Sequence, residues 1–248
     1  MKFRLKAFAW HLSGSATALA IVCGGLYLGW YRWPGWYLAN VGAIVLVMVG
    51  VDLALGPLLT LVVASPRKPR RELTRDIGVI VAVQVIALIY AAATLWSGRP
   101  LYFAFSVDRI ELVRASDIPA AEFEAAREQN SAFVPHWYST PRYVSAQLPD
   151  DSTAADAIKQ SALNGGLDVI DMPRYFRSWA SGVPALKLQL KAVDALTTIG
   201  RDDKLRLKLR LSRHGISPDD PSIILVTGRG DPLLAVIDKS TGQILDIP

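Results

Sequence analysis

Apolar residues gather in three long stretches near the start of the chain, at about Leu12–Trp30, Trp36–Ala64 and Ile77–Trp96. A helix that crosses a bilayer needs about 20 mostly apolar residues, and each stretch is long enough. The second stretch has enough residues to tilt or kink. The pattern therefore predicts a region of three transmembrane helices over residues 1–98.

Residues 99–248 lack such stretches and predict a soluble domain of mixed strands and helices. Leu101–Val113 is rich in aromatic and β-branched residues, which favours a strand. Ser116, Asp117 and Pro119 predict a helix start that continues over Ala120–Gln129. Further along, the sequence predicts a loop over Phe133–Pro149, a helix from Asp151 or Ser152 to about Leu163, and a short helix near Pro173–Ser181.

The end of this domain contains one ambiguous segment and one clear pattern. Within residues 186–213, leucines alternate with Lys and Arg as in a strand, yet these residue types favour a helix that Asp202 could begin and Gly215 could end. Both structures stay open. The clear pattern is an antiparallel meander with strands at Ser222–Thr227, Leu233–Asp238 and Gln243–Ile247 and a turn at Lys239–Gly242. The predicted fold is three transmembrane α-helices followed by a C-terminal α+β extracytoplasmic domain.

Positive charge is concentrated in the apolar part of the chain. Residues 1–98 carry nine Lys or Arg and three Asp or Glu, whereas residues 99–248 carry eighteen and nineteen. The net charge of +5 therefore arises from the flanks of the predicted membrane helices. We expect the lipid bilayer as a partner and no nucleic acid.

The basic residues also predict the orientation of the helices. Three precede the first stretch and five lie between the second and third, whereas only Arg32 lies between the first and second. Positive charges favour the cytoplasmic side, so the N-terminus is predicted inside the cell and residues 99–248 outside the cytoplasm. An interfacial belt of aromatic rings at the outer edge agrees with this: Trp30, Tyr31, Trp33, Trp36, Tyr37 and Trp96. The bulky end of the first stretch disfavours a cleaved signal peptide.

Asp52 is a carboxylate near the middle of the second predicted span. A charge at this depth costs at least about 2.5–3.5 kcal/mol, so it should face protein partners. Tyr90 of the third span lies at a similar depth and Gln84 roughly 7 Å nearer the cytoplasm, and both are candidate hydrogen-bond partners. Two roles stay open and are compatible: an interhelical clamp, and a site for partner binding or switching.

Gly56 and Pro57 follow Asp52 in the same span. Proline has no N–H, so the carbonyl of Leu53 loses its helical partner and a kink is expected at Pro57. The hydroxyl group of Thr60 is a candidate to satisfy that carbonyl.

The chain carries no motif for catalysis, a cofactor or a metal. It has no G-x-S-x-G, H-E-x-x-H, C-x-x-C or P-loop sequence. His11, His136 and His214 lie far apart in the sequence, and Cys23 is the single cysteine. We expect a protein that is not an enzyme and uses no cofactor.

Several segments in a fixed order resemble one family. They are Val51–Val62 (VDLALGPLLTLV), a basic loop ending at Asp76, Gln84 followed by Ala87–Tyr90 (ALIY), Arg99-Pro100, and Asp108-Arg109. Looser matches follow at Leu225–Arg229 (LVTGR) and Val236–Leu245 (VIDKSTGQIL). Together these segments resemble the type IV pilin accessory proteins of the TfpX/TfpZ kind, densely over residues 1–118.

The resemblance implies a multi-pass protein of the bacterial inner membrane with a periplasmic domain. Such a protein would act as a chaperone-like helper in the folding, stability or assembly of a cognate type IV pilin, major or minor, with the pilus assembly machinery as a further possible partner. The family has no catalytic residues to transfer. The matching positions are Asp52, Gly56, Pro57, Gln84, Tyr90, Arg99, Pro100, Asp108 and Arg109.

The last matching positions predict how the outer domain meets the membrane. Arg99 stands at the membrane exit, where its side chain is expected to reach the headgroups. Asp108 and Arg109 would point to opposite faces of one strand and should not pair. We interpret these residues as anchors of the domain to the bilayer.

Three other functions are compatible with the sequence. A membrane-anchored subunit of another envelope assembly would share every physical feature. A periplasmic ligand-binding or sensor module would need a deep pocket and a cytoplasmic signalling element. An enzyme acting at the outer interface would need convergent polar groups in a pocket.

Overall fold

The computed structural model describes residues 1–196 and 200–247, and the chain divides into two compact units, Met1–Arg99 and Pro100–Pro248. Residues 197–199, which fall within the ambiguous segment 186–213, and residue 248 lie outside the described residues.

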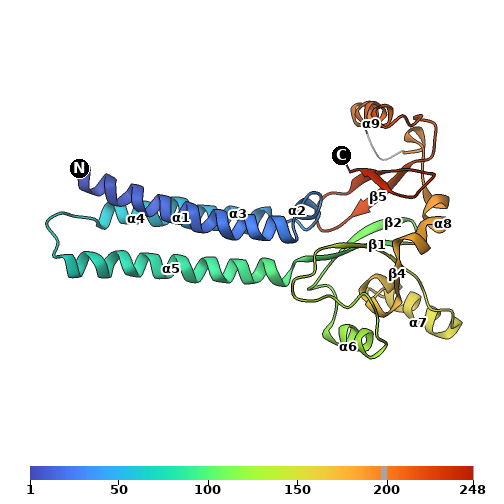
Figure 1. Cartoon of the computed structure of the whole chain (residues 1–248), viewed down its shortest axis with the longest axis horizontal. Helices are drawn as coiled ribbons and strands as arrows, with labels where there is room; N and C mark the ends of the chain where they lie inside the picture. The colour runs from blue at the N-terminus through green and yellow to red at the C-terminus, as the bar shows by residue number, and fades with distance from the viewer. Residues whose placement is uncertain (197–199, 248) are drawn as a thin grey trace. The chain divides into compact units, whose positions relative to one another are not determined.

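The first unit is helical (Figure 1). Among the described residues, three helices are long and apolar enough to cross a membrane: Lys2–Gly29, Gly42–Val63 and Arg70–Ser97. The first and third are α1 and α5. The second is built from α3 (Gly42–Val49), the π-helical segment η1 (Gly50–Leu55) and α4 (Gly56–Val63).

The second long helix begins later than the sequence predicts. Residues from Trp36 onward do not join it but belong to a separate short helix, α2 (Gly35–Leu38). Asn40 then turns the chain with a φ of 53°. Asn tolerates this left-handed conformation, which ends a helix, better than most residues. Asp52 consequently lies near the centre of the helix that starts at Gly42.

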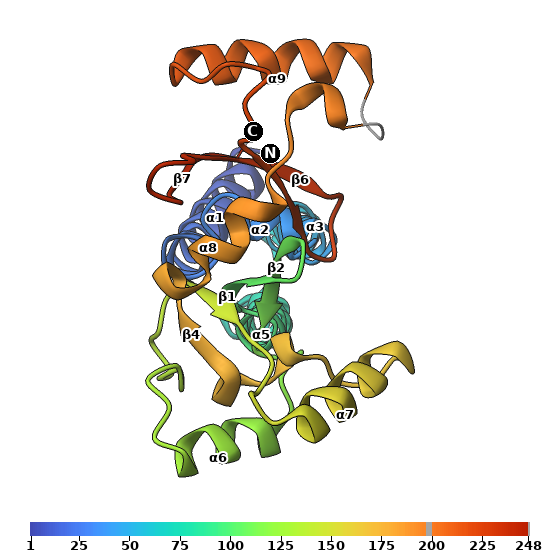
Figure 2. The same cartoon turned by 90° about the vertical axis from the view of Figure 1, so that its right-hand side faces the viewer.

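The second helix is the most enclosed of the three. Within its most apolar window 28% of the residues are buried, against 6% in α1 and in α5. Figure 2, which looks along the helices, shows α1, α3 and α5 at three corners of a triangle. Large apolar side chains cover the outward faces, among them Ile21, Leu46, Val62 and Ile86. Such extensive exposed apolar surface suits a non-aqueous environment.

The second unit, in its described part, contains one seven-stranded mixed sheet with the strand order β4-β3-β1-β2-β5-β6-β7. The strands are β1 (Pro100–Ser106), β2 (Arg109–Arg114), β3 (Arg142–Ala146), β4 (Phe176–Ser178), β5 (Ile223–Thr227), β6 (Leu233–Ile237) and β7 (Ile244–Asp246). The pairs β1–β3 and β2–β5 are parallel, and the others are antiparallel. The last three strands form the predicted meander.

Helices surround the sheet. They are α6 (Ala120–Glu128), α7 (Ser152–Leu163), α8 (Trp179–Gln189) and α9 (Arg201–Arg213), with short 3₁₀ turns η2 (Val169–Asp171), η3 (Pro173–Tyr175) and η4 (Val193–Ala195). Asp151 caps α7, as the sequence predicts, by accepting hydrogen bonds from Thr153 and Ala154. The helix expected near Pro173–Ser181 is divided between η3, strand β4 and the start of α8.

The predicted single strand Leu101–Val113 is a hairpin. Strands β1 and β2 pair with Ser106 opposite Arg109, and Val107 and Asp108 form the two-residue turn. Val107 has a φ of 54°, which is rare for a β-branched residue and runs against the usual turn chemistry. The sequence therefore gave no turn signal at this position.

Asp117 does not begin the helix that follows. Pro119 precedes α6 instead, and Asp117 accepts hydrogen bonds from Nε and Nη2 of Arg114 at 3.0 and 2.6 Å. Nη2 of Arg229 lies 3.4 Å away. Burial alone would raise the pKa of the Asp117 carboxyl group, but these two guanidinium groups hold it below its usual value. The contact ties the end of β2 to the loop after β5.

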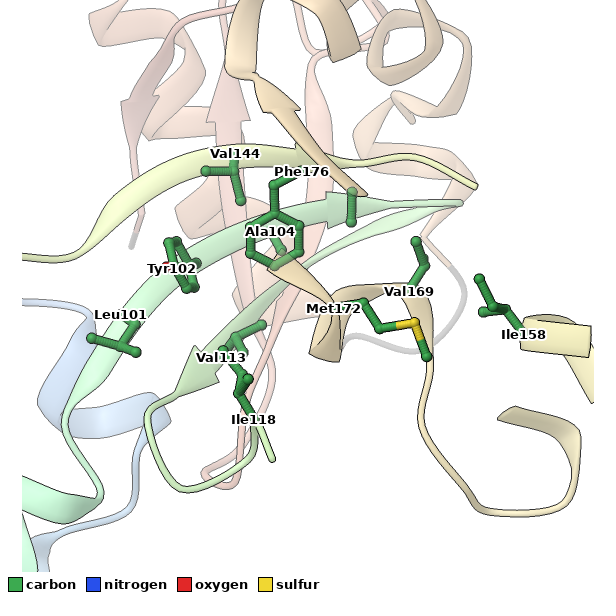
Figure 3. Close-up of a cluster of buried hydrophobic side chains, with 11 residues drawn as sticks. Leu101, Tyr102, Ala104, Val113, Ile118, Val144, Ile158, Val169, Met172 and Phe176 are labelled. Atoms are coloured by element: carbon green, nitrogen blue, oxygen red, sulfur yellow. The ribbon is translucent and has the colours of Figure 1, made fainter. Parts of the chain in front are cut away.

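Two separate apolar cores lie along the sheet. One packs residues of β1, β2 and β3 against η2, η3, β4 and α7, and Figure 3 shows Phe176 near its middle, with Val144 and Tyr102 beside it. The rings of Tyr102 and Phe176 meet edge to face with centroids 4.9 Å apart. The other core packs α9 and η4 against β5 and β6. Because β3 pairs with β1 in the first core, the loop predicted over Phe133–Pro149 is wrong for Arg142–Ala146.

The helical alternative is the right one for the leucine-rich part of the ambiguous segment. In α9, Leu207 and Leu211 lie one turn apart and are buried, whereas Leu205 and Leu209 are exposed. A strand would have placed all four leucines on one face.

Replacing Leu211 with Ala is therefore expected to cost about 2–5 kcal/mol in the free energy of unfolding, since it opens a cavity in the second core. Leu209→Ala is the matched control and should change stability by less than about 0.5 kcal/mol. Thermal unfolding of the full-length protein in detergent, followed by near-ultraviolet circular dichroism, measures both. Equal losses would contradict the helix.

Candidate functional site

The second long helix changes its hydrogen-bond register beside Asp52. In η1 the N–H of Gly56 bonds to the carbonyl of Val51, five residues earlier, instead of four. In the same register the donor for the carbonyl of Asp52 would be the N–H of Pro57, which does not exist. Pro57 thus leaves the Asp52 carbonyl without a helical donor. In an α-helical register it would have been the Leu53 carbonyl that lacked one.

Gln84 of α5 fills this gap. Its side-chain Nε2 lies 3.2 Å from the carbonyl oxygen of Asp52, 3.3 Å from that of Val51 and 3.3 Å from Oδ1 of Asp52. All three atoms are acceptors, so the amide nitrogen must face them. One side chain of α5 therefore serves both the backbone of the π-helical turn and the carboxylate.

The orientation of Gln84 determines the tautomer of His11. Oε1 of Gln84 lies 2.6 Å from Nε2 of His11 and can only accept, so this ring nitrogen carries the proton. In the neutral ring, Nδ1 then accepts from the hydroxyl group of Thr60 at 2.5 Å. With a neutral ring the donors run in one direction, from Thr60 to His11, Gln84 and Asp52. The four side chains join α1, α4, η1 and α5.

The role expected for Thr60 is not observed, because its hydroxyl group is bonded to His11 and not to a carbonyl freed by proline. Sequence reasoning also missed His11. The apolar stretch that predicts the first span starts at about Leu12, so His11 falls at its edge. In the structure α1 begins at Lys2, so His11 lies well inside a continuous helix.

Gly56 makes room for this arrangement. A Cβ atom at Gly56 would overlap the side-chain amide of Gln84. Asp52, Thr60 and Gln84 are all more than nine-tenths buried. Asp52, Gly56 and Gln84 thus meet at one point, which we call the polar cluster together with His11 and Thr60. No set of residues suited to hold a metal ion occurs among the described residues.

Tyr90 does not contact Asp52 in the manner expected. Its side chain is 75% exposed. It lines a groove of about 370 Å³ between α3 and α5, at whose end Asp52 also lies. Tyr90 is therefore a groove residue and not part of the polar cluster.

A second groove of about 460 Å³ opens on the other side of the polar cluster, between α1 and α5. Its α1 wall is made mostly of small residues, Ala7, Gly14, Ser15 and Ala18, and its α5 wall includes Ile77, Val81 and Val85. Asp52, His11, Thr60 and Gln84 border it as well. We call it the α1–α5 groove.

The C-terminal ends of α1 and α5 are joined by aromatic residues. Tyr31 donates a hydrogen bond from its hydroxyl group to the carbonyl oxygen of Leu95 at 2.7 Å. The rings of Trp30 and Trp96 meet edge to face with centroids 4.9 Å apart. Gln84 and Leu95 are the buried residues of α5, so this helix is held at its middle and near its C-terminal end.

Arg99 is folded back on the helix that precedes it. Its guanidinium group lies over the ring of Trp96 at 4.3 Å, and Nη1 donates to the carbonyl oxygen of Trp96 at 2.9 Å. Burial lowers the pKa of Arg99. Pro100 is the first residue of β1. The side chain therefore closes the end of α5, and its expected contact with the headgroups stays a prediction.

Asp108 and Arg109 do pair, against expectation. Nε of Arg109 lies 2.9 Å from Oδ1 of Asp108. The two residues are not neighbours within one strand, because Asp108 belongs to the hairpin turn and Arg109 begins β2. Both side chains are about half exposed, so the pair adds little stability.

Comparison with known proteins gives three related matches. Over 243 residues the chain is 22% identical to the fimbrial assembly protein of serogroup I from Dichelobacter nodosus. The aligned region covers 96% of this chain and 92% of that protein. The chain is 21% identical over the same length to the serogroup E1 protein of that organism. The protein of serogroups C1 and C2 is 28% identical over 124 residues, half of this chain and 95% of that protein.

No family model matches the chain, and no solved structure matches it. The names of the relatives agree with the broader part of the resemblance, to proteins of pilus or fimbrial assembly. The narrower assignment to the TfpX/TfpZ kind stays a prediction.

The polar cluster yields a direct test. Gly56→Ala is expected to lower the stability of the helical unit by about 1–2 kcal/mol, because the new methyl group would push the Gln84 amide off its partners. In a Gln84→Ala background the same replacement should cost much less. Unfolding by titration of mixed micelles with SDS measures these free energies.

Gly50→Ala is the matched control for this test, because a Cβ atom at Gly50 meets nothing within 4 Å. If Gly56→Ala costs the same with and without the Gln84 side chain, Gly56 does not act through the amide.

Proposed function

We propose that the protein spans the bacterial inner membrane three times and assists a cognate type IV pilin in folding, stability or assembly. The observation that carries this proposal is similarity to fimbrial assembly proteins along nearly the whole chain. The three apolar helices support it, since their outward faces suit lipid and not water.

In this proposal the N-terminus and the basic connection 64–69 lie in the cytoplasm, and the sheet-containing unit lies in the periplasm. The distribution of Lys and Arg supports this orientation. A pilin that awaits assembly has an apolar helix in the bilayer and a globular head outside it. A helper with both a membrane unit and an outer domain has a surface for each part. The role requires binding and not catalysis.

The orientation predicts which positions are reached by a membrane-impermeant thiol reagent. In a Cys23→Ser background, a cysteine in place of Leu163, which is 81% exposed, should be labelled in spheroplasts. A cysteine in place of Arg67 in the basic connection should be labelled only after the membrane is opened by detergent. The reverse pattern would show the opposite orientation.

The function predicts that loss of the gene lowers the amount of cognate pilin or of surface pili. Immunoblots of pilin, with electron microscopy of pili, should show the decrease and its reversal by the intact gene. If both are unchanged and another envelope complex fails to assemble, the proposal is wrong and the protein serves that complex.

A further inference from the structure

The α1–α5 groove has the shape of a helix-binding surface. The α1 residues that line the groove recur every three or four positions from Ala7 to Ala18. They form a strip about 16 Å long on one face of the helix. Four of the six lining residues of α1 are small, which lets helix backbones approach closely within a membrane, whereas Trp10 and His11 are large. A Cβ atom at Gly14 would meet nothing within 4 Å, so the groove is open at that point.

One oxygen of a largely buried carboxylate faces this groove and has no donor among the described residues. Asp52 is only 4% exposed, yet it borders the α1–α5 groove. Its Oδ1 shares the Gln84 amide with two backbone carbonyls. Its Oδ2 receives no hydrogen bond from the described residues. Oδ2 is not among the fully buried atoms that lack a partner, so it is open to the groove, where lipid tails offer no hydrogen bond.

The clamp between helices does not account for this carboxylate. Gln84 already joins α5 to the π-helical turn through the carbonyls of Val51 and Asp52. The carboxylate adds one shared contact at 3.3 Å and leaves its second oxygen unused. An apolar side chain would keep the backbone contacts without the cost of a buried charge.

The missing donor points to a protein helix as the occupant. Lipid acyl chains would fill the groove but offer no donor to Oδ2. A second copy of this chain would also bring donors, because Trp10 and Ser15 line the same groove, so the proposed function and not the donor selects a different protein. A helix from a different membrane protein can bring a donor of its own.

We propose that the α1–α5 groove is the seat of the pilin's membrane helix and that Oδ2 of Asp52 accepts a hydrogen bond from a side chain or terminal amine of that helix. The identity of the occupant rests on the proposed function. The recognised chemistry is an apolar helix that carries an N–H or O–H donor near the middle of the bilayer.

Photocrosslinking at Val81 and Val83 tests the seat in the full-length protein. Both are valines of α5, but Val81 lines the groove whereas Val83 is 60% exposed and lines neither groove. Benzoylphenylalanine at position 81 should capture pilin in cells, and at position 83 it should not. Capture of only lipid, or of a second copy, at position 81 would overturn the proposal, as would equal capture of pilin at both positions.

Asp52→Asn tests the carboxylate. The amide keeps an oxygen for Gln84 but places an N–H donor where Oδ2 was, so the clamp remains and the acceptor is lost. Pilin capture at Val81 should fall about fivefold or more, at an unchanged level of the protein. Unchanged capture would remove Asp52 from the proposed seat.

Gly14→Leu tests the groove by filling it, without removing any contact. Gly25→Leu is the matched control, because Gly25 also has open space but does not line the groove. Capture should be lost in the first variant and kept in the second. Equal capture in both would overturn the seat.

These outcomes separate the seat from the proposed function. If the gene is needed for pilin or pili but Val81 never captures pilin, the seat is wrong and the function stands. If pilin and pili do not depend on the gene, both are wrong, because the occupant named here is pilin.

Discussion

The hydrogen bonds from the side chain of Gln84 to the turn around Asp52 hold the helical unit together. They arise because Pro57 cannot donate to the carbonyl that the π-helical register assigns to it. In an apolar setting a free carbonyl is costly, and an amide from a neighbouring helix is one way to satisfy it. The backbone defect of one helix thereby becomes the attachment point of another, and Gly56 provides the space.

This attachment also explains why α5 has grooves on both sides. The helix is fixed at Gln84 and near Leu95, and its other residues remain partly or fully exposed. A bundle held by apolar packing along its whole length would leave no such space. Two point contacts leave α5 correctly placed while the surfaces beside it stay open to other helices.

The sequence predicts what depends on local pattern. Run length gave the three apolar helices, and turn residues gave the capped helix after Asp151 and the meander at the end of the chain. It did not predict strand β3, which joins the sheet through a parallel pairing with β1 across about 40 residues of chain. The hairpin turn at Val107 was missed because a β-branched residue occupies a position that usually needs Gly or Asn.

The polar cluster could be predicted only in part, for a related reason. Asp52 and Gln84 stand out as polar residues within apolar stretches, so their importance follows from hydrophobicity. His11 joins them through partners 49 and 73 residues away in the sequence, which no local pattern reveals. The direction of the donors is likewise a property of the assembled helices. With a neutral His11 ring, each group from Thr60 to Gln84 donates toward Asp52, so the chain of hydrogen bonds ends on an acceptor. A further donor can join this cluster at that end, where Asp52 borders the α1–α5 groove.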